Sequence, residues 1–172
     1  ARWKGTTWYD RTNYYETVNA SDDNLRWALG LEAERMVNMR IEKALLDTEM
    51  TVVRNEFERD ENDPSSALDK EVGATAFIAH PYHHPTIGWR SDIEKVSIEK
   101  LREFYDTFYW PNNATITVIG DFQPQNALAL IKKYFGAITR SPKPIPAVYT
   151  EEPAQSGPRR IIVKRPGEVG VV

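Results

Sequence analysis

The residues most able to bind a metal ion or transfer a proton gather in one short stretch. All three histidines of the chain, His80, His83 and His84, lie within AHPYHHPTIGW at residues 79–89. The spacing His-x-x-His-His has the form of a His-x-x-Glu-His zinc motif in which a histidine replaces the glutamate. Zinc motifs of this kind hold the metal from two histidines one helical turn apart, so a site of this type requires a helix, although a loop could also gather histidines around a metal.

Two prolines argue against that helix. Pro81 follows His80 and Pro85 follows His84, and a residue before proline is disfavoured in the helical region. The histidine at the glutamate position of the motif also leaves the stretch without the glutamate that would act as general base. The sequence therefore predicts a structural loop anchored by His80, Pro81 and Tyr82, with His83 and His84 exposed and Gly88 allowing a sharp turn.

A second candidate is a pair of glutamates on a helix predicted from about Ile41 to about Glu61. Glu49 and Glu56 are seven residues apart, so they lie two turns apart on nearly the same line of the helix. They fall near the middle of a predicted apolar stripe formed by Ile41, Leu45, Leu46, Val52 and Val53. Because an unpaired buried carboxylate is costly, the two glutamates indicate an ion pair with a neighbour such as Arg35 or Arg59, a helix end that emerges into solvent, or a metal or catalytic site.

The elements that position these residues can be read from caps and periodicity. A strand is expected over 6–18, and helices are expected from Ser21, from Pro64, from Ser97 up to Pro111, and from Pro124 to Gly136. Further strands are expected over 114–120 and 160–164. This mixture predicts an α+β fold, a two-layer sandwich with a mostly antiparallel sheet and helices on one face.

The domain organisation is also expected from composition. Residues 1–139 form one domain whose start is missing, residues 140–158 form a proline-rich linker, and residues 159–172 begin a following domain. Both ends of the chain lie in strand-like sequence, which predicts a fragment of a longer protein.

Composition excludes some classes of function. A net charge of -3 offers no basic surface for nucleic acid, and the absence of cysteine removes disulfides and thiolate metal sites. No apolar run is long enough to span a membrane, and the first residues lack the form of a signal peptide. The cellular compartment stays open, with periplasm and cytoplasm both compatible. The aromatic residues are spread over separate elements, which favours core packing over a stacking platform for sugars or bases.

The order of motifs resembles the N-terminal half of zinc peptidases of the pitrilysin/insulinase family, including its processing-peptidase branch. The resemblance covers about residues 5 to 139. It is carried by the stretches GTTWYDRTNYYETV, LRWALGLEAERM, VVRNEFERDENDP, HPYHHPTIGW, LREFYDTFYWPNNATITVIGDF and YFGAI.

The resemblance implies roles for the two glutamates. In the family, two histidines of an upstream His-x-x-Glu-His helix bind zinc, and the glutamate of that motif activates the attacking water. The third ligand matches Glu56, and a supporting glutamate seven residues earlier matches Glu49. The signature is absent from this chain. Zinc is therefore expected in the intact parent protein and not in this chain, which is expected to be inactive.

The resemblance further implies that a peptide substrate adds as a strand near Gly5, Thr6 and Thr7. Lys4 departs from the family, which often has asparagine there. We expect a zinc metalloendopeptidase, a hydrolase of peptide bonds, with a peptide or protein substrate and a second half or partner subunit. Two alternatives remain open: a non-catalytic partner or scaffold subunit of the same fold, and an unrelated α+β binding module with ion-paired glutamates.

Overall fold

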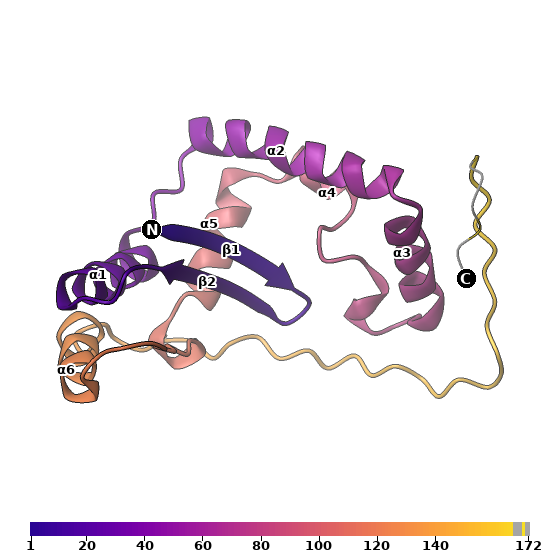
Figure 1. Cartoon of the computed structure of the whole chain (residues 1–172). Coiled ribbons are helices and arrows are strands. Elements are labelled where there is room, and N and C mark those ends of the chain that lie inside the picture. The colour runs from indigo at the N-terminus through magenta and orange to yellow at the C-terminus, as the bar shows by residue number, and fades with distance from the viewer. Residues whose placement is uncertain (167–169, 171–172) are drawn as a thin grey trace. The chain divides into compact units, whose positions relative to one another are not determined.

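The computed structural model describes residues 1–166 and 170 (Figure 1). It divides into two compact units, and each unit is assembled from separate stretches of the chain. The first unit comprises Ala1–Thr6, Thr12–Glu42 and Ser97–Pro146, and the second comprises Thr7–Arg11, Lys43–Val96 and Ala147–Val172. The domain boundaries expected from composition remain a prediction.

The β-sheet found among the described residues is a single β-hairpin. Strand β1 (Arg2–Trp8) pairs with strand β2 (Arg11–Thr17), and Tyr9 and Asp10 form the turn between them. The single strand predicted over 6–18 is therefore wrong. Tyr-Asp gave no turn signal because short hairpin turns are normally marked by glycine or asparagine at positive φ, and no described residue other than glycine has a positive φ.

The first unit contains helices α1 (Asp22–Asn38), α5 (Ile98–Phe108) and α6 (Pro124–Phe135). The predicted caps are confirmed: the side chains of Ser21 and Ser97 accept hydrogen bonds from the backbone N–H groups of Asn24 and Lys100, at 3.2 and 3.3 Å. Helix α5 ends before Pro111, which opens the short helix η2 (Pro111–Asn113). Helix α1 packs on α6, where Leu29, Ala33 and Ala127 form a buried core.

The second unit contains helices α2 (Lys43–Asn62), α3 (Pro64–Ala76) and α4 (Arg90–Lys95), with the short helix η1 (Pro81–His83) in the histidine loop. Helix α2 packs against both α3 and α4. The buried residues of this unit are Leu46, Phe57, Ala67 and Ile93. Helix α4 was not predicted, because it is short and its first residue follows Trp89, which makes no side-chain cap.

The predicted sandwich is not confirmed. About half of the chain is helical, and the described residues contain one two-stranded antiparallel sheet. The strands expected over 114–120 and 160–164 do not form, since neither segment has a hydrogen-bonded neighbour strand among the described residues. An apolar, β-branched segment becomes a strand only when a ladder satisfies its backbone groups, and Ile119 instead remains 90% exposed.

No helix in the described part of the chain has the length and apolar character needed to cross a membrane.

Candidate functional site

Helix α2 carries Glu49 and Glu56 on an exposed line, not on its buried stripe. The buried positions are Leu46 and Phe57, whereas Leu45 and Val52 are 55% and 52% exposed. The predicted apolar stripe was therefore rotated by about one residue, or about 100° around the helix. Phe57, which the predicted stripe omitted, anchors the true buried face.

Glu56 has an arginine neighbour, as one of the sequence alternatives expected. Its carboxylate lies 3.9 Å from the Arg59 guanidinium, and the two side chains are 54% and 73% exposed. Exposed ion pairs of this kind contribute about 0–1 kcal/mol to folding. The pairing therefore does not commit Glu56 to a structural role, because its carboxylate remains available to solvent. The other expected arginine, Arg35, pairs elsewhere.

The line formed by Leu45, Glu49, Val52 and Glu56, here termed the α2 open line, alternates apolar and acidic side chains. All four positions are exposed. The α-carbons of Glu49 and Glu56 are about 10 Å apart along the helix, so both reach one ion directly only if their side chains extend toward each other. This spacing suits one ligand and one supporting group better than two ligands.

The described residues fit zinc only in part. A carboxylate oxygen is an accepted zinc ligand, and Glu56 presents one outward on a rigid helix. No group of three or more His, Asp or Glu side chains able to hold a metal ion occurs among the described residues. The described residues therefore contain no complete zinc ligand set.

The histidine loop uses its rings to stabilise its own backbone. The backbone N–H of Tyr82 donates to His80 Nδ1 at 3.2 Å, so His80 caps helix η1. His83 Nδ1 lies 2.9 Å from the carbonyl oxygen of His80, and His84 Nδ1 lies 3.0 Å from that of Pro85. A ring nitrogen engaged in this way is not free to bind a metal through that atom, which supports the structural interpretation.

Two further expectations for this loop have different outcomes. Gly88 has φ +84°, which confirms the sharp turn at a position where other residues would be strained. His83 and His84 are half-buried, so the expectation that they are exposed is wrong. Their rings pack edge to face with centroids 5.6 Å apart.

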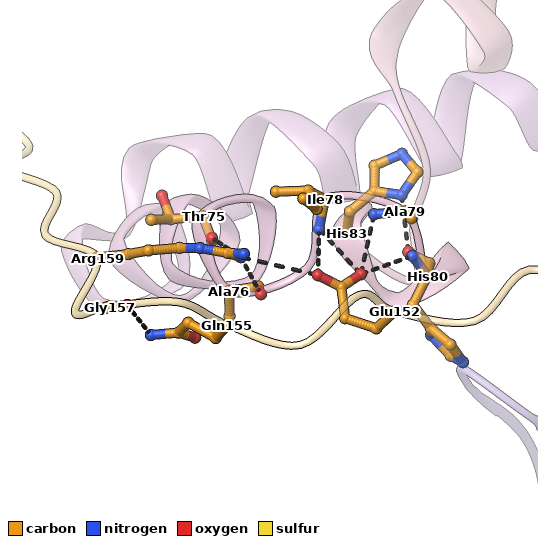
Figure 2. Close-up of polar contacts among 10 residues, drawn as sticks. All are labelled: Thr75, Ala76, Ile78, Ala79, His80, His83, Glu152, Gln155, Gly157 and Arg159. Carbon is orange, nitrogen blue, oxygen red and sulfur yellow. Dashed lines mark hydrogen bonds and ion pairs between the residues drawn. The ribbon is translucent and has the colours of Figure 1, made fainter.

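Glu152, in the segment expected to be a linker, binds the start of the histidine loop (Figure 2). Its carboxylate accepts hydrogen bonds from the backbone N–H groups of Ile78, Ala79 and His80, at 2.9 to 3.1 Å. Hydrogen bonds to a carboxylate favour its charged form. Those from His80, Ile78 and Ala79 therefore lower the pKa of Glu152 to about 2.

Arg159 completes this contact at the end of α3. Its guanidinium donates to the carbonyl oxygens of Thr75 and Ala76 at 2.9 and 2.6 Å, and it lies 3.7 Å from the carboxylate of Glu152. The last carbonyl groups of a helix have no N–H donor within the helix, and the partial negative charge at this end favours a cation. We call Glu152 and Arg159 the polar clamp. The proline-rich segment is thus attached to α3 rather than free.

A cluster of ionisable groups that sequence reasoning missed lies between β2 and α1. Arg35 pairs with Glu32 at 3.1 Å and with Glu16 at 3.8 Å. Its guanidinium also lies 4.3 Å from the ring centre of Tyr14. The Glu16 side chain is 9% exposed. Burial, together with the neighbouring Glu32 carboxylate, raises the pKa of Glu16 to about 7, against the opposing charge of Arg35.

The predicted substrate edge lies on β1. Gly5 and Thr7 are exposed, and Thr6 is half-buried. A Cβ added at Gly5 would meet the ring of Tyr14 at 3.6 Å, an ordinary contact distance, so the space itself does not require glycine. The structure places these three residues together on one strand and does not test their role.

Comparisons with known proteins identify relatives of this chain. The model of the family "Peptidase M16 inactive domain" matches residues 95–171. The chain is 33% identical over 164 residues to "Zinc protease PqqE" of Helicobacter pylori, covering 94% of this chain and 36% of that protein. The chain thus spans about a third of the length of that relative.

Solved structures give the same result. A crystal structure of a protease from Helicobacter pylori matches with a TM-score of 0.85 and 32% identity, over 91% of this chain and 38% of that chain. The first half of the periplasmic protease PqqL from Escherichia coli matches with a TM-score of 0.77 and 24% identity, over 89% and 33% of the two chains, which shows likeness of fold. The chain therefore belongs to the peptidase M16 family, the pitrilysin/insulinase-type zinc peptidases.

Proposed function

We propose that this chain is part of a zinc metalloendopeptidase and contributes the third zinc ligand, Glu56, to an active site completed by residues outside it. The observation that carries the proposal is the placement of Glu56 on the α2 open line. There its carboxylate is exposed one helical turn after the exposed side chain of Val52, in a chain similar to proteins named zinc proteases.

Each residue of the open line has a distinct task in this proposal. Glu56 binds the metal, and Glu49, two turns earlier, supports the site without binding the ion itself. Leu45 and Val52 provide apolar surface that packs against the element carrying the other ligands. The zinc ion, when bound, polarises water for attack on a peptide bond. The general base is the glutamate of a His-x-x-Glu-His motif, which this chain lacks.

The substrate in this proposal is an extended peptide that adds to β1 at Gly5, Thr6 and Thr7. An unpaired strand edge offers the backbone N–H and C=O groups that hold such a peptide. The domain division into 1–139, 140–158 and 159–172 belongs to the same proposal. The polar clamp supports a role for the middle segment as an attached spacer and not as a loose tether.

A second candidate is a non-catalytic partner or scaffold subunit of the same fold. The match to a family model described as an inactive domain favours it. Under either candidate a second half or partner subunit completes the assembly. The sequence of the full-length protein outside this chain distinguishes the two candidates. An intact His-x-x-Glu-His motif there supports the peptidase, and a degraded motif supports the scaffold.

The metal content of the purified chain gives a first test. One carboxylate with a supporting neighbour does not hold zinc, because affinity requires the full ligand set in place. Elemental analysis after dialysis should therefore find far less than one zinc ion per chain. Stoichiometric zinc lost on Glu56→Gln replacement would show that this chain holds a complete site and would contradict the proposed division of ligands.

A further inference from the structure

The outward face of the β-hairpin carries two unpaired cationic side chains. Arg2 and Lys4 are separated by one residue of β1, so both side chains point to the same face of the sheet. Both are exposed. Neither side chain forms an ion pair in the part of the chain that the structure describes.

The opposite face of the hairpin is already occupied. There the hydroxyl groups of Tyr14 and Tyr109 lie 2.5 Å apart, and Glu16 meets Arg35 of α1. Because side chains alternate along a strand, Tyr15 and Thr17 of β2 lie on the opposite face of the hairpin from Tyr14 and Glu16. That face is the one to which Arg2 and Lys4 belong.

A shallow groove marks this outward face. Its lining residues are Ala1, Arg2, Trp3, Lys4, Tyr15 and Thr17. The two-residue turn sets the register of the hairpin so that Lys4 lies opposite Tyr15 and Arg2 lies opposite Thr17. The groove therefore combines two cationic side chains and the terminal amino group of Ala1 with a 46% exposed tyrosine ring, and none of its lining side chains is acidic.

An added peptide strand would bring its own side chains beside these cations. Alternate residues of a paired strand face the same side of the sheet as their cross-strand neighbours, and opposite charges in such pairs stabilise the pairing. We propose, on the basis of the strand addition proposed above, that β1 selects peptides with two acidic residues separated by one position. Arg2 and Lys4 are the residues that determine this specificity.

The test measures binding of this chain to short, end-capped peptides that carry a neutral fluorophore. Three peptides share one Thr- and Val-rich sequence and differ only at two positions separated by one residue, which hold Glu, Gln or Lys. Anisotropy should show the Glu peptide binding about 2- to 30-fold tighter than the Gln peptide, from two cross-strand charge pairs. The Lys peptide should bind more weakly than either, and the preference should shrink between about 0.05 M and about 0.5 M salt.

Charge reversal locates the effect. Lys4→Glu should abolish or invert the preference for the Glu peptide. The control is Lys143→Glu, which makes the same change in net charge at an exposed lysine remote in sequence from the hairpin and should leave the preference intact. Circular dichroism confirms that both variants fold. Equal binding of all three peptides, or equal effects of the two variants, overturns the proposed selectivity. Because no zinc or cleavage is involved, these results are independent of whether Glu56 binds metal.

Discussion

The carboxylate of Glu152 accepts a hydrogen bond from the backbone N–H of His80 at 2.9 Å, although the two residues lie 72 positions apart in the chain. The same carboxylate binds the two preceding N–H groups, and Arg159 binds the end of α3 beside it. One carboxylate and one guanidinium thus hold a segment without regular secondary structure against the end of α3 and the start of the histidine loop.

Replacing Glu152 by Gln should loosen this segment. An amide oxygen is a weaker acceptor than a carboxylate, and the ion pair with Arg159 is lost. Limited proteolysis should cut residues 147–159 faster in the variant, with the helices still folded by circular dichroism. Glu151→Gln is the matched control, because Glu151 is exposed. Equal cleavage of the two variants would show that the polar clamp does not hold the segment.

The pKa of Glu152 adds a pH dependence to the same experiment. Since the folded-state pKa is lowered to about 2 from 4.5, the stabilisation is present above pH 4.5 and is lost as pH falls toward 2. Proteolysis by an acid-active enzyme should therefore accelerate in the wild-type segment below about pH 4.5. In Glu152→Gln the rate should depend little on pH over this range, after correction for the protease itself.

Glu16 should impose the opposite pH dependence on the first unit. Its folded-state pKa is raised from 4.5 to about 7, so its contribution to stability is present below pH 4.5 and is lost as pH rises through 7. Glu16→Gln should raise the unfolding midpoint at pH 8 relative to wild type and flatten the pH profile. Glu34→Gln on the exposed side of α1 is the control and should follow the wild-type profile.

Adjacent leucines test the orientation of α2. Leu46 is 9% exposed and Leu45 is 55% exposed. Leu46→Ala should therefore cost about 2–5 kcal/mol of unfolding free energy, whereas Leu45→Ala should change it by no more than about 0.5 kcal/mol. Denaturant unfolding of the two variants measures both values. Equal costs would mean that Glu49 and Glu56 do not lie on an exposed line.

Local signals in the sequence predicted much of the helical structure. Ser21 and Ser97 cap helices as expected, and Pro124 and Gly136 bound α6, because caps and breakers act within a few residues of the chain. The turn at Tyr9 and Asp10 was missed because that dipeptide carries no strong turn preference.

The candidate site was predictable only in part. The seven-residue spacing places Glu49 and Glu56 on one line, but which line is buried depends on the elements that pack against α2. The raised pKa of Glu16 depends on its burial and on the neighbouring Glu32, and the polar clamp depends on residues more than 70 positions apart. Pairings at such distances follow from tertiary packing and leave no periodic signal in the sequence.

The central claim, that Glu56 is a zinc ligand, is tested most directly by Glu56→Gln in the full-length protein, with zinc content and peptide cleavage measured together. Glu58→Gln is the matched control, because Glu58 is on the same helix, similarly exposed at 56%, and paired with Arg90. Our account predicts that Glu56→Gln loses most of the zinc and the cleavage activity, whereas Glu58→Gln keeps both. Full zinc occupancy and wild-type cleavage in Glu56→Gln would contradict it.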